Sequence, residues 1–337
     1  QAIELLYWEQ GGNARLLLEY KLSSDTTYQT MSLNNVAMFT DENAPTLTNP
    51  LIQDLVYDTA TFNWAVRTGS VLDGGALTDT LTGGAGRDIL TGNGGVDTLN
   101  GNDGADTLYG NDGNDILNGG AGSDRLIGGA GAETLTGSTG DDTYVLSDTL
   151  DSIVETAGQG YDTVVFDASY VASNTAYTLG NNLENASVEG ASNFNVTGNA
   201  ANNRLEGNAA SNTLSGLDGN DYLVGGGGND TLTGGNGVDT YVWQKGDGGT
   251  VVLPATDTIT SYNYTDDKLD LRDLLQGENT TSSNSGSGAG AVEISDLLNY
   301  IDVSVSGGTT TLRISSTGNL TGGGTGGQDQ VIQLTGV

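Results

Sequence analysis

The stretch GNDGADTLYGNDGNDILN, residues 101–118, contains two copies of a nine-residue pattern that runs through much of the chain. Eight consecutive copies extend from Gly74 to Val145, and five more extend from Gly198 to Val242. Each copy opens with a glycine-rich half and has leucine or tyrosine at its eighth position. The sixth position is acidic throughout the first run and in the last three copies of the second.

This period predicts how the backbone folds. Glycine in the first half of each copy lets the chain take positive φ and turn tightly. The residues around the eighth position then form a three-residue strand whose apolar side chain points inward. One copy cannot bury that side chain alone, but stacked copies bury a continuous row of them. We therefore predict an all-β fold, a parallel β-roll in two arrays with β-rich capping segments at both ends.

Stacking the copies also stacks their acidic side chains, at about one strand spacing of ~4.8 Å. Like charges at that separation repel one another unless a cation lies between them. Calcium suits such a site because it takes about 6–8 oxygen ligands from carboxylates and backbone carbonyls. The alternative is a surface of acidic turns without an ion, and the register kept over eight consecutive copies argues against it. Calcium is the predicted cofactor.

The pattern G-G-x-G-x-D-x-U-x resembles the RTX nonapeptide, a calcium-binding β-roll repeat, over about a third of the chain. The resemblance implies that two repeats complete one coil and that each ion bridges loops two repeats apart. Roughly six to nine ions are expected, each held by oxygen ligands. The predicted metal ligands are the carboxylates of Asp79, Asp88, Asp97, Asp106, Asp115, Asp124, Asp142, Asp221, Asp230 and Asp239, and the backbone of Gly84, Gly86, Gly95, Gly104, Gly113, Gly122, Gly219 and Gly228.

Several repeats depart from the pattern. Leu77 replaces a glycine in the first copy, and Glu133 replaces aspartate in the seventh. Asn203 and Asn212 occupy the acidic position at the start of the second run, so within that run strong sites are expected only around Asp221, Asp230 and Asp239. The third position is Asp or Asn in some copies, where the side chain is either an additional ligand or a turn residue that tolerates the left-handed conformation. These residues are Asp103, Asp112, Asp218 and Asn236.

Composition excludes several classes of function. The chain has 43 acidic and 10 basic residues and a formal net charge of −33, which makes nucleic acid and anionic membranes poor partners. It has no histidine and no cysteine, so histidine-based triads, HExxH zinc sites and disulfides are excluded within it. No G-x-S-x-G elbow occurs, and no apolar run approaches the ~18 residues of a membrane helix. We predict no enzyme activity, no catalytic residue and no organic cofactor.

The segments outside the repeats each have a predicted role. Residues 1–45 form a β-hairpin around Gly11–Asn13, and IELLYWEQGGNARLLLEYK resembles the last strands of a protective-antigen-like β-sandwich. An ordinary capping hairpin is the alternative. Residues 46–73 are a connector and cap. Residues 146–197, between the arrays at 74–145 and 198–242, are expected to continue the apolar ladder without calcium, through Val164, Val165, Phe166, Leu179, Leu183, Val188, Phe194 and Val196.

Residues 243–337 are predicted to form a C-terminal cap. Ser295 is the expected N-cap of a short helix over 296–301, and IDVSVSGGTTTLRIS is a hairpin around Gly307–Gly308. The sequence DTITSYNYTDDKLDLRDLL, with the later LLNYI and a terminal strand, resembles the C-terminal target region of large type I-secreted adhesins. That resemblance implies a type I secretion signal at this end.

The resemblances together predict a structural and secretion module of a bacterial RTX adhesin, and the strand-like opening indicates a fragment of a longer protein. The expected location is outside a Gram-negative cell or on its surface. Expected partners are calcium, the type I secretion machinery and, through upstream domains, surface glycans or host cells. The alternative is the secretion module of an RTX hydrolase or protease with its catalytic domain upstream. Ice binding is disfavoured because the residues before the acids are irregular.

Overall fold

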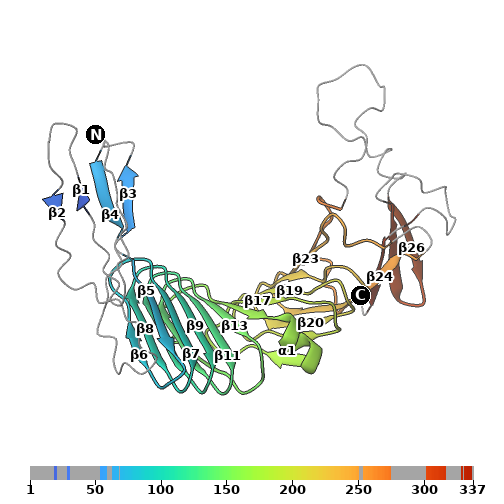
Figure 1. The fold of residues 1–337 in the computed structure, drawn as a ribbon. Helices are drawn as coiled ribbons and strands as arrows, with labels where there is room; N and C mark the ends of the chain where they lie inside the picture. The colour runs from blue at the N-terminus through green and yellow to red at the C-terminus, as the bar shows by residue number, and fades with distance from the viewer. Residues whose placement is uncertain are drawn as a thin grey trace.

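In a computed structural model the chain forms a parallel β-solenoid whose strands stack side by side along its length (Figure 1). The structure describes residues 69–249, 253–274, 301–315, 328 and 330–335, and the backbone of four short strands at 19–20, 29–30, 54–58 and 63–67. The predicted all-β class and parallel β-roll are confirmed.

One sheet of eleven strands runs through both arrays and the segment between them. Its strands, all parallel, are β5 (Val71–Gly75), β7 (Ile89–Gly94), β9 (Thr107–Asp112), β11 (Arg125–Ala130), β13 (Thr143–Leu146), β15 (Thr163–Phe166), β17 (Asn185–Val188), β19 (Arg204–Glu206), β21 (Tyr222–Val224), β23 (Thr240–Val242) and β25 (Lys268–Asp270).

Two further sheets contain the alternate strands of the coil. The first array contributes β6 (Thr80–Thr82), β8 (Thr98–Asp103), β10 (Ile116–Ala121), β12 (Thr134–Thr139) and β14 (Ser152–Val154). The later part contributes β16 (Ala176–Thr178), β18 (Asn195–Thr197), β20 (Thr213–Asp218), β22 (Thr231–Asn236), β24 (Ala255–Thr260), β28 (Gln330–Thr335), β27 (Thr309–Ile314) and β26 (Ile301–Ser306), in that order across the sheet.

The strand register confirms that two repeats make one coil. Leu90 pairs with Leu108 and Leu108 with Leu126, so neighbours in a sheet are eighteen residues apart. Many strands have six residues instead of the predicted three, because pairing continues into the next repeat, as between Gly120 and Ser138. The left-handed conformation falls on second positions such as Asn93, Asn102 and Asn111. The interpretation of the third-position residues as left-handed turn residues is therefore wrong.

The eighth-position residues form the core. From Leu90 to Tyr144 each is 0% exposed, and the row continues through Leu205, Leu214, Leu223, Leu232 and Tyr241. Between the arrays, Phe166 packs on Tyr177 and Phe194, with ring centroids 4.8 and 5.0 Å apart. All the residues predicted to continue the ladder there are buried except Val165, which alternates outward between Val164 and Phe166.

A single short helix, α1 (Ala168–Ser173), interrupts the strands of the described residues. The sequence analysis missed it because DTVVFDA is strand-like up to Asp167. Asp167 is the N-cap residue, and its Oδ1 accepts a hydrogen bond from Tyr170 N–H (2.8 Å). The helix lies between β15 and β16, and its residues Tyr170 and Val171 are buried in the apolar core.

The last repeat of each array has tyrosine instead of leucine at its eighth position, and the hydroxyl explains the exchange. Tyr144 Oη accepts a hydrogen bond from Gly137 N–H (2.7 Å), and Tyr241 Oη accepts one from Gly234 N–H (2.9 Å). Elsewhere the corresponding glycine N–H donates to a carbonyl of the next coil, as Gly83 does to Asn100 (2.8 Å). The tyrosine hydroxyl thus replaces a carbonyl where the regular coil ends.

The C-terminal strands extend the solenoid sheet. β28 pairs with β24 in parallel, and β27 and β26 follow as an antiparallel hairpin. Gly307 and Gly308 have φ of 59° and 81°, so the predicted hairpin turn is confirmed. The expected helix lies outside the described residues except for Ile301, which is in β26.

Short antiparallel pairs occur near the N-terminus. They join β1 (Glu19–Tyr20) to β2 (Gln29–Thr30) and β3 (Asp54–Asp58) to β4 (Asn63–Arg67). The predicted hairpin around Gly11–Asn13 and the β-sandwich remnant lie outside the described residues, apart from Glu19 and Tyr20.

Candidate calcium centre

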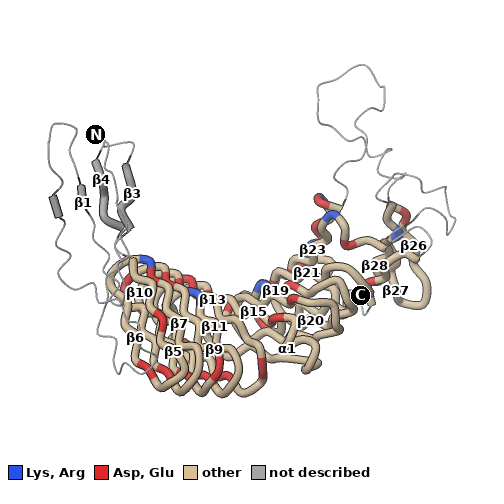
Figure 2. Tube along the Cα trace, viewed as in Figure 1, with Lys and Arg blue, Asp and Glu red and all other residues tan. Residues whose placement is uncertain are grey.

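The sixth-position acids stand in rows along the solenoid edges, each directly before a strand (Figure 2). Asp79, Asp97 and Asp115 precede the strands of the five-stranded sheet. Another row precedes the strands of the eleven-stranded sheet and contains Asp88, Asp106, Asp124, Asp142, Asp221 and Asp239. Asp230 belongs to a third row, whose next acid, Asp257, lies within β24. The predicted ligands therefore come together as three rows.

One hydrogen bond repeats along each row. Asp106 Oδ1 accepts from the backbone N–H of Asp88 (2.7 Å), and Asp124 Oδ1 accepts from that of Asp106 (2.7 Å). The same bond joins Asp115 Oδ1 to Asp97 N–H (2.8 Å) in the other row. Each carboxylate thus binds the backbone at the start of the strand one coil earlier. The same hydrogen bond fixes the orientation of the carboxylate and therefore of its second oxygen, Oδ2.

That second oxygen has no protein partner in most repeats. It is buried and unpaired in Asp79, Asp97, Asp106, Asp115, Asp124, Asp142, Asp221, Asp230 and Asp239. Asp88 differs because its Oδ2 accepts from Gly84 N–H (2.6 Å). A buried charged oxygen left without a partner costs free energy. Its recurrence in nine of the ten predicted acids indicates that another group completes it.

The first glycine of each repeat lies against this oxygen. A Cβ on Gly74 would lie 2.8 Å from both Asp79 Oδ2 and Gly92 O. A Cβ on Gly101 would likewise overlap Asp106 Oδ2 and Gly119 O. The space beside a carboxylate oxygen and a carbonyl oxygen of the next coil is therefore kept free of side chains. Such a set of hard oxygen donors fits calcium.

The fourth glycines explain the other recurring turn of the loops. Gly104 and Gly122 have φ of 145° and 133°, and a Cβ on either would overlap the carbonyl oxygen of the fourth glycine one coil earlier. In the other row Gly113 stacks in the same way on Gly95, and Gly95 lies over the carbonyl of Leu77. Gly219 and Gly228 instead lie over the carbonyls of Ala201 and Ala210. At Gly104 and Gly113 the same space also borders Oδ1 of Asp106 and of Asp115, so a backbone carbonyl and a carboxylate lie close together there.

Asparagine at the acidic position gives a coil that is complete without an ion. Asn212 Nδ2 donates to Phe194 O (2.6 Å), and its Oδ1 accepts from Asn208 N–H (2.9 Å). Asn203 Nδ2 donates to the carbonyls of Leu183 and Glu184, both at 3.2 Å. Neither asparagine has an unpaired buried side-chain atom.

Burial raises the pKa of the acids. Desolvation is the largest cause for Asp106 and Asp142, whose pKa is about 7, and for Asp230, whose pKa is about 8. Neighbouring acids in the row raise these values further, including Asp124 beside Asp106 and Asp257 beside Asp230. Burial without a cation therefore disfavours the ionised form of these three carboxyl groups, and a bound cation would oppose that effect.

The rows also contain acids that the nine-residue pattern does not reveal. Asp162 Oδ1 accepts from Asp142 N–H (2.9 Å), and Glu184 Oε2 accepts from Asp162 N–H (2.9 Å). Asp267 Oδ1 accepts from Asp239 N–H (3.1 Å). These acids are separated by 20, 22 and 28 residues instead of 18. The available signal was an acid or amide directly before a strand-forming run, as in Asp162-Thr-Val-Val-Phe.

Two groups of three carboxylates each bring one ligand atom per residue within 4.8 Å of one another: Glu133 with Asp148 and Asp151, and Asp142 with Glu155 and Asp162. Both lie where the first array meets the following segment. In the second group, Glu155 also accepts a hydrogen bond from the Tyr144 hydroxyl, and Asp162 from Asp142 N–H.

Comparison with known proteins identifies the class. A family model described as the RTX calcium-binding nonapeptide repeat (4 copies) matches residues 73–108, 109–144, 197–232 and 206–241. No curated protein matches the chain. The repeats and the stacked coil together define a calcium-binding β-solenoid module. More particularly, residues 73–144 and 197–241 match RTX nonapeptide repeats, which bind calcium and indicate a calcium-binding RTX module. In the part of the chain that the structure describes, no helix is long and apolar enough to cross a membrane.

Proposed function

We propose that this chain is the calcium-dependent structural and secretion module of a secreted bacterial RTX adhesin and performs no chemistry of its own. The observation that carries the proposal is the row of buried, unpaired carboxylate oxygens, each beside a glycine that leaves the space open. A chain built in this way depends on calcium for its fold.

The energetics support a switch between cell interior and exterior. Extracellular calcium modules have dissociation constants around 10⁻⁴–10⁻³ M. At calcium ten times Kd, each site stabilises the fold by about 1.4 kcal/mol. Roughly six to nine sites then contribute about 10 kcal/mol, comparable to the stability of a whole domain. At cytosolic calcium this contribution is absent, and ordering the glycine-rich loops costs backbone entropy.

The proposal continues with export. The array stays unfolded in the cell, passes the type I secretion machinery with its C-terminal signal in residues 243–337, and folds on meeting calcium outside. The resemblance of DTITSYNYTDDKLDLRDLL to adhesin target regions supports the signal. The extension of the solenoid sheet by β28 to β26 supports a capping role for the same end.

Far-UV circular dichroism of the full chain, first in chelator and then in millimolar calcium, tests the proposal. We expect a coil spectrum in chelator and a β spectrum after calcium addition, with magnesium as the control ion. Full β signal in chelator would contradict it. Fusing residues 243–337 to an unrelated reporter in a strain with a type I system tests the secretion part separately.

A further inference from the structure

At the end of the first array, one acid leaves the regular row. Glu133 occupies the sixth position of its repeat and is 1% exposed, yet both of its carboxylate oxygens lack a hydrogen-bond partner. In neighbouring positions the acid accepts from the backbone one coil earlier, as Asp115 does from Asp97 N–H. Glu133 makes no such bond to Asp115.

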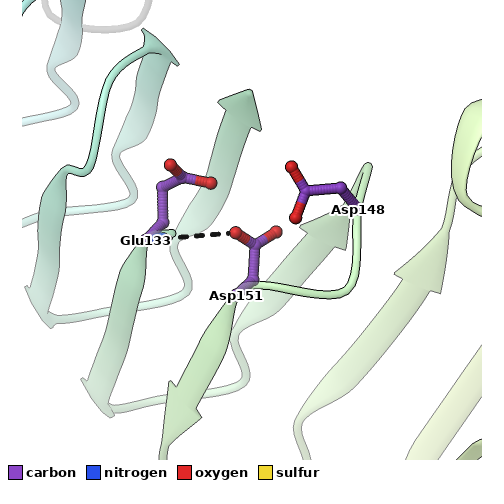
Figure 3. Close-up of side chains that lie close together, drawn as sticks. All are labelled: Glu133, Asp148 and Asp151. Carbon is purple, nitrogen blue, oxygen red and sulfur yellow. Dashed lines mark hydrogen bonds between the residues drawn. The ribbon is translucent and has the colours of Figure 1, made fainter. Parts of the chain in front are cut away.

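The longer side chain instead faces two acids from the next coil. Figure 3 shows the Glu133 carboxylate beside those of Asp148 and Asp151, and one oxygen of each lies within 4.8 Å of the others. Asp151 Oδ1 accepts from Glu133 N–H (3.3 Å), while its Oδ2 is buried and unpaired. Asp148 is fixed by accepting from Gly131 N–H (3.3 Å) and Leu150 N–H (2.8 Å).

No cation of the described residues forms an ion pair with these carboxylates. Among the described residues, every ion pair of the chain lies elsewhere, at Arg204, Arg272 and Arg313. Three carboxylates around one space, one of them almost fully buried, repel each other strongly. Burial and the two neighbouring acids accordingly raise the pKa of Glu133.

The corresponding end of the second array shows how the same problem is solved without an ion. There Asp257 Oδ1 accepts from Asp230 N–H (2.8 Å), and its Oδ2 accepts from Trp243 Nε1–H (2.7 Å) and Gln330 Nε2–H (2.8 Å). Both oxygens are therefore satisfied by the protein. Glu133 has no such donors, so its site requires a partner from solution.

We propose that Glu133, Asp148 and Asp151 form a divalent-cation site, distinct from the nonapeptide loops, that closes the first array. Asp148 and Asp151 lie outside the residues matched by the repeat model, whereas Glu133 is the aberrant member inside them. Oxygen-only ligands select a hard cation, and calcium accommodates irregular carboxylate geometry better than magnesium does.

The number of charged ligands predicts the calcium affinity of this site relative to that of the repeat loops. A repeat loop offers one orphaned carboxylate oxygen and backbone carbonyls, whereas this site offers three carboxylates. Calcium affinity rises with the number of charged ligands. The site therefore binds calcium at a lower calcium concentration than the repeat loops do, and the end of the array becomes ordered first. This ranking rests on the proposed calcium-binding function of the repeats.

The test is calcium titration of the full chain by isothermal calorimetry, with Asp148→Asn and Glu133→Gln as variants. Asp148→Asn changes a half-buried residue that lies outside the nine-residue repeats, and its amide oxygen can still accept from Leu150 N–H. Glu189→Gln, at an exposed position, is the matched control for charge. Circular dichroism at saturating calcium verifies that each variant folds.

We expect the tightest binding phase to lose one ion per chain, or to weaken about tenfold or more, in both site variants, and to stay unchanged in Glu189→Gln. Full tight-phase stoichiometry and affinity in Asp148→Asn would overturn the inference while leaving the repeat sites standing. If the unmodified chain itself binds no calcium, the proposed function fails as well. Magnesium that occupies the tight phase equally well would also contradict the choice of ion.

Discussion

Replacing Asp106 by asparagine separates the two functions of a repeat carboxylate. Asp106 Oδ1 holds the N–H of Asp88, and Oδ2 is buried and unpaired. An asparagine oxygen can keep the first bond. Its amide can donate to a carbonyl of the preceding coil, as Asn212 does to Phe194 O. Asp106→Asn should therefore stabilise the calcium-free coil and weaken the calcium-bound one.

The magnitudes predict a crossover. Removing one unsatisfied buried oxygen stabilises the calcium-free form by about 1–3 kcal/mol. Losing one ion removes about 1.4 kcal/mol at ten times Kd and about 4.1 kcal/mol at a thousand times Kd. The variant should therefore be the more stable protein in chelator, and the less stable by about 1–3 kcal/mol at a thousand times Kd. The two stability curves cross at roughly 5 to 150 times Kd.

Urea unfolding of the full chain, followed by circular dichroism over a calcium series, measures this crossover. Where chelator leaves the chain unfolded, trimethylamine N-oxide can drive folding so that the calcium-free forms can be compared. Glu189→Gln serves as the exposed control with the same change of charge. Equal destabilisation of Asp106→Asn at every calcium concentration would refute the reasoning, because the carboxylate would then act only as a structural acceptor.

Three further outcomes are expected. Gly104→Ala places a Cβ at a backbone φ of 145° and against Gly86 O, so it should lower the free energy of unfolding in calcium by about 1–3 kcal/mol or more. Gly84→Ala, where a Cβ meets open space, should leave the free energy of unfolding nearly unchanged. Equal urea midpoints for the two variants would contradict this prediction. Leu108→Ala removes a fully buried side chain and should lower the free energy of unfolding by about 2–5 kcal/mol. Leu77→Ala, at a 66% exposed position, should change the free energy of unfolding little. Similar decreases for the two variants would contradict the proposed core of stacked eighth-position residues. In chelator, lowering the pH from 8 to 5 should increase the β signal in circular dichroism. In the folded chain the pKa values of Asp106, Asp142 and Asp230 are about 7 to 8, above the unfolded value of 3.8. Protonation of these carboxyls therefore stabilises the folded state fully below about pH 4, and this stabilisation is lost as the pH rises through 7 to 8. A β signal that rises with pH in chelator would have the wrong sign.

Much of the repeat architecture follows from the sequence because the physics there is local and repeated. A glycine-rich turn and one apolar residue every nine positions leave stacking as the way to bury Leu90, Leu108 and Leu126. The same period places the sixth-position acids in rows. The departures at Asn203 and Asn212 were also visible as a loss of charge.

Tertiary structure alone decided the ends of the arrays. The rows continue through Asp162, Glu184 and Asp267 at spacings that depend on the length of each intervening loop, which the nine-residue pattern does not specify. The loop after β13 brings Asp148 to Glu133, and residue Gln330 reaches Asp257 across 73 positions of sequence. Whether an acid at an array end meets neutral donors or other carboxylates depends on how the chain leaves the coil. Sequence periodicity therefore determined the coil and its rows of acids, and the packing of non-repeating segments determined which oxygens remain unpaired.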